Sequence, residues 1–110
     1  FVWRAEDSIK RVFLQSLFTG DGSASLLARN SVQVSYSTRS RRLAVEVQRL
    51  LLEMGVVSKQ CSYANGEIKV VIGNRRDVRI FSREVGFLGR KQVKLETILS
   101  GLPTARTSAR

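Results

Sequence analysis

The sequence contains no histidine, and it has only one cysteine, one proline and one methionine. Histidine is the usual general base near neutral pH and a common zinc ligand. Its absence excludes His-dependent nucleases, His-Asn-His endonucleases and most zinc enzymes. A single cysteine, Cys61, excludes an intrachain disulfide and suits a reducing compartment. Its place between polar neighbours in a strand-like segment favours a role as core filler over one as nucleophile.

Long apolar segments are absent too, and no signal peptide is visible. We therefore expect no membrane partner and a cytoplasmic location. The only methionine is Met54, so Phe1 is not a natural start. We expect the chain to have been cut from a longer polypeptide.

Positive charge is what the sequence has in excess. The 110 residues carry 19 Lys and Arg against 9 Asp and Glu, a net charge of +10. The length fits one domain with a modest core, and such a field favours a polyanionic partner, with nucleic acid the first hypothesis. A basic protein without such a partner remains open. A basic amphipathic membrane binder is less favoured, because the cations are spread along the whole chain.

The segment Leu14–Gly22 holds the most informative pattern. Apolar residues at 13, 14, 17 and 18 follow the spacing of one helical face. Ser16 and Gly20 are small and four residues apart, so a second helix backbone can approach that side. Gly20 and Gly22 allow a sharp turn at the end of the helix, with Asp21 between them.

Asp21 stands in an electrostatically unfavourable place. A helix C-terminus carries partial negative charge, so a carboxylate there is disfavoured, and a bound cation would offset the repulsion. The residue is therefore either a metal ligand or an ordinary turn residue after a glycine-terminated helix.

The rest of the chain alternates between strand and helix patterns. Residues 23–38 read as two strands with a tight turn near Arg29 and Asn30. Thr38 or Ser40 caps a helix that ends at Gly55. Val56–Tyr63 and Glu67–Ile72 form a second pair joined by an Asn-Gly turn. Asn74 caps a helix that closes at Gly86, and a short helix ends at Leu99. Asp7 or Ser8 is the expected cap of the first helix.

The second and fourth strands each present a polar face. Residues 31–37 alternate strictly, with Val32, Val34 and Tyr36 on the buried side. The opposite side carries amides and hydroxyls, which suit the reading of base edges in a major groove, although a plain solvated face has the same pattern. Arginines crowd the start of the following helix and suggest phosphate contacts, although a solvated charge cluster explains them equally well. The DNA-contact candidates are Arg29, Gln33, Ser35, Ser37, Arg39, Gln60, Ser62 and Lys69.

Leu14–Gly22 resembles the motif of the LAGLIDADG homing endonucleases. Leu14, Leu17, Asp21 and Gly22 match letter for letter, and Phe18 and Gly20 are conservative changes. Ser16 and Thr19 depart from the motif. The resemblance covers about Ser8 to Leu99 and is closest to the second half of a two-motif endonuclease embedded in a bacterial intein.

This resemblance implies an α+β fold of order α-β-β-α-β-β-α, with a saddle-shaped antiparallel sheet and helices on one face. Residues 1–7 would be a lead-in, 8–100 the unit, and 101–110 a tail or linker. Two units would pair through the first helix, at Phe13, Ser16, Leu17 and Gly20. The catalytic residues would be Asp21 and Lys91, with Lys94 as second choice for the lysine.

The implied activity is site-specific, Mg²⁺-dependent hydrolysis of both strands of duplex DNA after pairing with a second unit. That unit would belong to the same parent chain or to a homodimer. Asp21 and the backbone oxygen of Gly20 would bind the metal, and the bacterial protein would associate with the nucleoid. The alternative is a non-cleaving DNA- or RNA-binding module of the maturase or regulator type.

Overall fold

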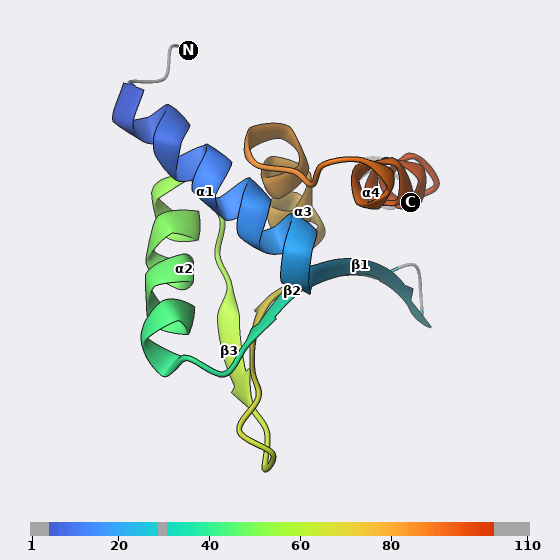
Figure 1. The fold of residues 1–110 in the computed structure, drawn as a ribbon. Coiled ribbons are helices and arrows are strands. Elements are labelled where there is room, and N and C mark those ends of the chain that lie inside the picture. Colours follow the sequence, from blue (N-terminus) through green and yellow to red (C-terminus); the bar gives the residue numbers. More distant parts are fainter. Residues whose placement is uncertain (1–4, 29–30, 103–110) are drawn as a thin grey trace.

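The computed structural model describes residues 5–28 and 31–102, so Arg29 lies outside the described residues (Figure 1). The elements are α1 (Ala5–Asp21), β1 (Gly22–Leu27), β2 (Ser31–Thr38), α2 (Arg41–Glu53), β3 (Lys59–Ser62), β4 (Ile68–Ile72), α3 (Arg75–Glu84) and α4 (Arg90–Ser100). The predicted α+β class is confirmed, with two helices after the second hairpin. Within the described ranges, no helix has the length and hydropathy needed to cross a bilayer.

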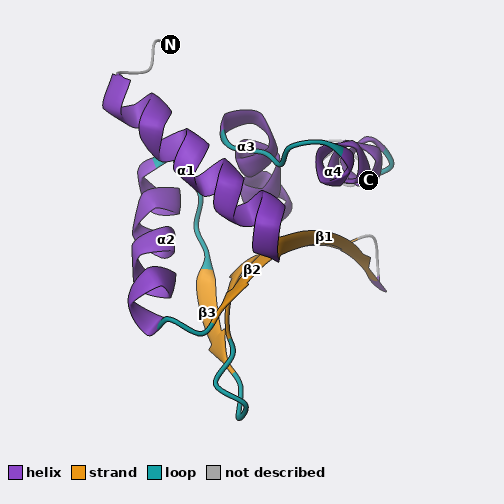
Figure 2. Cartoon of the chain, viewed as in Figure 1, coloured by secondary structure: helices purple, strands orange, loops and turns teal. Residues whose placement is uncertain are grey.

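The four strands form one antiparallel sheet in the order β1-β2-β4-β3. The helices gather on one side of the strands (Figure 2). Val32, Val34 and Tyr36 of β2 are buried on that side, as their alternation predicts. Ile68, Val70 and Ile72 of β4 join them in the core. The other side of the sheet, here called the outer face, carries the alternate residues.

Helix α1 has two apolar sides. Leu14 and Phe18 are completely buried, and the Phe18 ring lies 4.8 Å from the Phe81 ring and 5.4 Å from the Tyr36 ring, centroid to centroid. Phe13, by contrast, is 42% exposed. The single apolar face predicted for residues 13–18 is therefore divided, with one half in the core and the other toward solvent.

Close packing, and not a left-handed turn, explains the glycine at the end of α1. Gly20 and Gly22 are absent from the glycines with positive φ. A Cβ atom on Gly22 would lie 2.6 Å from the backbone oxygen of Phe18 and 2.9 Å from that of Ser35. The prediction that these glycines serve as flexible turn residues is therefore wrong. Glycine is required at position 22 because α1 and β2 leave no room there for a side chain.

The hairpin and two caps follow the sequence. Gly66 has φ +91°, as the Asn-Gly turn requires, and the Gly66 amide donates to the Tyr63 carbonyl. Ser40 Oγ accepts from the Leu43 amide, which decides between Thr38 and Ser40 as cap of α2. Asn74 Oδ1 accepts from the Arg76 amide at the start of α3.

Two predicted boundaries are wrong. Helix α1 begins at Ala5, so Asp7 and Ser8 lie within the helix and do not cap it. Strand β3 begins only at Lys59. Val56 lies in the turn that follows α2, where its amide donates to the Leu51 carbonyl and its side chain is buried.

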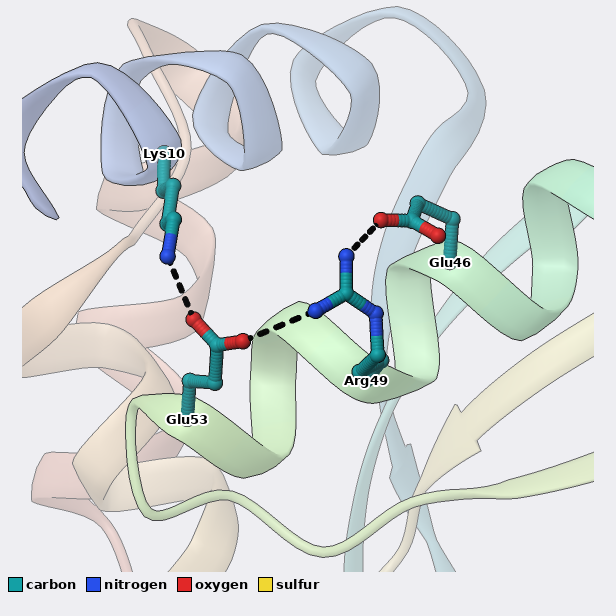
Figure 3. Close-up of polar contacts among 4 residues, drawn as sticks. All are labelled: Lys10, Glu46, Arg49 and Glu53. Carbon is teal, nitrogen blue, oxygen red and sulfur yellow. Dashed lines mark hydrogen bonds and ion pairs between the residues drawn. The ribbon is translucent and has the colours of Figure 1, made fainter. Parts of the chain in front are cut away.

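A surface network of charges joins α1 to α2 (Figure 3). Lys10 Nζ lies 2.8 Å from Glu53 Oε1, and Arg49 Nη1 lies 3.0 Å from Glu53 Oε2. Arg49 also pairs with Glu46. The hydrogen bond from Lys10 lowers the pKa of Glu53 below its ordinary 4.5. The stabilisation is therefore present above about pH 4.5 and fades as the pH falls through the lowered pKa.

Candidate functional site

The candidate site lies where α1 ends and β1 begins. Asp21 is the last residue of α1, and its side chain is exposed. Helix α1 has no basic residue in its last turn, so the helix itself does nothing to offset the carboxylate or the partial negative charge of its end.

Lys91, in the first turn of α4, contacts the backbone at this end of α1. Its Nζ atom donates to the carbonyl oxygens of Thr19 and Gly22, at 2.7 Å in each case. These two carbonyls flank Gly20 and Asp21 in the sequence, so the ammonium group is fixed at the end of α1. Lys94 is exposed one turn further along α4. Of the two lysines considered from the sequence, Lys91 is the one whose ammonium group contacts the end of α1.

The negative charge of Asp21 affects the pKa of the Tyr36 phenol. Burial raises the pKa of Tyr36 above its ordinary value of 10.0, a hydrogen bond with Thr38 opposes this rise, and the charge of Asp21 adds to it. Tyr36 pairs with Gly22 in the β1–β2 register. The buried aromatic core therefore lies directly behind the exposed acid.

This proximity gives a pH prediction. Because an amide does not repel a phenolate, Asp21→Asn should lower the pKa of Tyr36. Because the pKa of Tyr36 is higher in the folded than in the unfolded chain, its contribution to stability is fully present below about pH 10. That contribution is lost as the pH rises through the folded-state pKa. Alkaline absorbance titration of tyrosinate in a Tyr63→Phe background isolates Tyr36. Glu46→Gln is the charge-matched control. If the titration midpoint of Tyr36 is unchanged in Asp21→Asn, the charge of Asp21 does not act on the phenol.

The outer face of the sheet is polar and partly cationic. Directly paired residues of antiparallel strands share a face. Gln33 pairs with Ser25, Ser35 with Ser23 and Val71, and Ser37 with Lys69. Lys69 pairs in turn with Cys61, and Val71 with Lys59. The outer face thus comprises Ser23, Ser25, Leu27, Ser31, Gln33, Ser35, Ser37, Lys59, Cys61, Lys69 and Val71.

The parity predicted for β3 is wrong. Gln60 pairs with Val70 and Ser62 with Ile68, so both lie on the helix-covered face. Gln60 Nε2 donates to Gln48 Oε1 of α2. Gln60 and Ser62 were predicted to contact DNA because they were expected on the outer face. They are not on that face. Lys59 and Cys61 take those places, which also removes Cys61 from the core.

Several outer-face residues are engaged within the protein. Ser35 is only 9% exposed and its hydroxyl lies 3.5 Å from that of Ser23. Ser37 donates to the Glu67 carboxylate. Arg39 is exposed and its Nη1 donates to the Asn65 carbonyl, 2.6 Å away, in the β3–β4 turn. Lys69 Nζ lies 5.8 Å from the centre of the Tyr63 ring. Sequence reasoning missed Ser23, Ser25 and Lys59, although the Ser-Ala-Ser alternation around buried Ala24 indicates the first two.

An apolar and small-residue stripe on α1 faces solvent. Ile9 is 70% exposed, Val12 60% and Phe13 42%, and Ser16 and Gly20 continue the same side toward Asp21. Apart from its chain neighbours and the backbone of α1 itself, nothing lies within 4 Å of a Cβ built on Gly20. Leu17, the fourth residue predicted for a helix contact, is partly buried against the core.

The donor set at Asp21 limits what this unit can hold. The described residues contain no cluster of three or more His, Cys, Asp or Glu side chains. Asp21 offers one exposed carboxylate next to helix-end carbonyls. Mg²⁺ prefers oxygen ligands and keeps several waters, so such a partial set fits it when phosphate oxygens or a second carboxylate complete the shell.

A family-level match covers this region. The model of the LAGLIDADG-like domain matches residues 8–86, most of the chain. The chain belongs to the LAGLIDADG family. The match contains Asp21 and both hairpins, whereas Lys91 lies beyond it.

Curated relatives of this LAGLIDADG chain are much longer proteins. It is 55% identical over 103 residues to the A-subunit of DNA gyrase from Mycobacterium gordonae, covering 94% of this chain and 19% of that protein. The gyrase A-subunit of Mycobacterium leprae is 50% identical over 95 residues, covering 86% and 8%. A replicative DNA helicase DnaB of Synechocystis is 32% identical over 95 residues, covering 79% and 11%. The LAGLIDADG chain therefore spans a fifth or less of each of these three relatives.

Solved structures show the same fold at low identity. The homing endonuclease I-CvuI, bound to DNA in the presence of 2 mM Mg with the DNA not cleaved, matches at TM-score 0.74 and 13% identity, covering 88% of this chain and 68% of that one. The archaeal intron-encoded homing endonuclease I-Vdi141I in complex with DNA matches at TM-score 0.62 and 11% identity, covering 86% and 69%. The LAGLIDADG chain thus has the homing-endonuclease fold.

Proposed function

We propose that this chain is one unit of a site-specific endonuclease that cuts both strands of duplex DNA after pairing with a second LAGLIDADG unit. The observation that carries the proposal is the exposed carboxylate of Asp21 at the end of α1, with the Lys91 ammonium fixed on the carbonyls that flank it. Beside it begins β1, whose outer-face hydroxyls continue the polar row of β2.

The outer face would bind the duplex. Hydroxyl and amide groups of Ser25 and Gln33 suit base edges, and the cations Lys59 and Lys69 suit phosphates. The residues proposed to contact DNA are Ser23, Ser25, Gln33, Ser37, Arg39, Lys59 and Lys69, with Arg29 kept as a sequence-based candidate. Buried Ser35 would act through its neighbours on the sheet.

A divalent cation such as Mg²⁺ would lower the pKa of an attacking water and stabilise the leaving oxygen, which accounts for chemistry without histidine. Asp21 would bind this cation through its carboxylate, and Gly20 through its backbone oxygen. Lys91 would keep a positive charge beside the scissile phosphate. The residues of one unit provide only part of the ligand set, so a second unit is needed.

Pairing would use the solvent-facing side of α1. Ile9, Val12 and Phe13 supply exposed apolar surface, and Ser16 and Gly20 allow two helix backbones to approach near the acid. A second copy of Asp21, or its equivalent in another unit, would then lie next to the first. This unit would come from the same parent chain or from a homodimer.

The relatives support an intein as the parent element. The gyrase A-subunit and the DNA helicase DnaB are different proteins, and in each the shared segment is a small part of the length. A segment common to such proteins is expected of an inserted, self-splicing element. We infer a bacterial host in which the enzyme acts on nucleoid DNA in the cytoplasm.

Plasmid cleavage tests the proposed activity. The longer parent protein should linearise a plasmid that carries the uninterrupted host gene, in Mg²⁺ and not in EDTA. The 110-residue chain, held monomeric at low concentration, should bind the plasmid and leave it uncut. Double-strand cutting by the monomer would contradict the need for pairing. DNA binding by the parent without any cutting would instead favour a non-cleaving module.

A further inference from the structure

Thr19, one of the two departures from the motif, makes two side-chain hydrogen bonds. Its Oγ1 donates to the Gln15 carbonyl at 2.7 Å and accepts from the Leu88 amide at 2.9 Å. The first bond fixes the hydroxyl rotamer against the preceding helical turn. The second crosses 69 residues of sequence, from α1 to the segment that precedes α4.

The segment around Leu88 is restrained at Phe87, but Leu88 itself is loosely packed. Gly86 and Gly89 both have φ +70°, which permits the reversal between α3 and α4. Phe87 is buried and its amide donates to Gln92 Oε1. Leu88, however, is 55% exposed. Packing therefore does little to fix Leu88 itself. The segment is restrained toward α1 by the Phe87 ring, whose centroid lies 6.3 Å from that of Phe18, and by the bond from the Leu88 amide to Thr19.

The position of this turn decides where Lys91 lies. Helix α4 begins at Arg90, so Lys91 is in its first turn, three residues after Leu88. Lys91 Nζ reaches the carbonyls of Thr19 and Gly22 only while α4 stays close to the end of α1. Thr19 thus contacts the turn with its side chain and the lysine with its carbonyl.

We propose that Thr19 is a positioning residue, whose hydroxyl holds the Leu88 turn against α1 and thereby keeps the Lys91 ammonium beside Asp21. Its kinetic consequence rests on the proposed nuclease function, but the placement of Lys91 does not. Serine would preserve both hydrogen bonds, whereas valine has the same shape and makes neither. The inference therefore concerns the hydroxyl group and not the volume of the side chain.

The placement is tested in the 110-residue chain without DNA or metal. Thr19→Val should raise the acetylation rate of Lys91 toward that of exposed Lys94, measured by mass spectrometry, and should speed hydrogen exchange at the Leu88 amide. Thr19→Ser should keep both protections. Thr97→Val is the matched control, because Thr97 Oγ1 makes the same helical bond to a carbonyl, that of Val93, at 2.8 Å. Unchanged Lys91 reactivity in folded Thr19→Val, or loss of protection in folded Thr19→Ser, would overturn the proposal.

Kinetics of the parent protein separate this inference from the proposed function. Thr19→Val should lower kcat for DNA cleavage by about 10- to 100-fold, the usual cost of misplacing a reacting group, with KM for DNA unchanged and Thr19→Ser close to wild type. A parent that never cuts DNA would refute the nuclease, while the acetylation result would still decide the role of Thr19. Equal kcat in wild type and Thr19→Val, with Lys91 displaced, would refute the kinetic part of the inference.

Discussion

Asp21→Asn in the parent protein is expected to reduce double-strand cleavage by about 10³-fold or more, because it removes the charged oxygen that would bind the cation at the scissile phosphate. DNA affinity should stay the same or rise, since the change removes a negative charge that lies near the DNA. A time course of plasmid linearisation, together with filter binding at the same salt, measures both quantities.

The charge-matched control for this experiment is Glu46→Gln on α2. Glu46 pairs with Arg49 in the surface network of Figure 3 and is not one of the residues proposed to bind DNA or metal. This variant should cut at the wild-type rate. Cleavage by Asp21→Asn at the wild-type rate would show that Asp21 takes no part in the reaction. An equal loss of cleavage rate in both variants would indicate a general effect of charge.

Gly22→Ala is expected to destabilise the isolated chain by about 3 kcal/mol, the upper part of the usual range for overpacking a core. The added Cβ would lie 2.6 Å and 2.9 Å from two backbone oxygens, those of Phe18 and Ser35. Backbone atoms cannot rotate away as a side-chain tip can, so α1 and β2 must separate. Urea denaturation followed by circular dichroism gives the change in the free energy of unfolding.

Gly20→Ala is the matched control two residues earlier. A Cβ at Gly20 meets nothing within 4 Å outside its chain neighbours and the backbone of α1 itself, and alanine favours helix. The free energy of unfolding of the isolated chain should therefore stay equal or rise by up to about 1 kcal/mol. The same methyl group would obstruct close helix contact, so paired units should dissociate more readily. A loss of stability in Gly20→Ala as large as in Gly22→Ala would contradict the packing explanation.

Local patterns were sufficient to predict most of the fold. The alternation in β2, the Asn-Gly turn and the Asn74 cap each depend on residues within a few positions of one another. The placement of Asp21 at a helix end followed from the same short-range patterns. These features depend on neighbouring residues and not on tertiary contacts, so the sequence alone was enough to predict them.

The errors arose where distant segments decide the outcome. The parity of β3 is set by its pairing with β4 and by Gln48 of α2, and not by its own four residues. The two apolar sides of α1 could not be separated without knowing which one packs on Phe81. The contacts of Thr19 with Leu88 and Lys91 join residues 69 and 72 positions apart, which no local pattern indicates.

The proposed function depends on duplex DNA lying on the outer face of the sheet. Non-specific duplex binding typically has a Kd of about 10⁻⁴ to 10⁻⁶ M, so NMR titration of the ¹⁵N-labelled chain with a short duplex at low salt is feasible. We predict that the amide resonances of Ser25, Gln33 and Lys69 shift, while those of Val45 and Leu52 on the exposed side of α2 do not. Shifts centred on α2, with the outer-face resonances unmoved, would contradict this placement of the DNA.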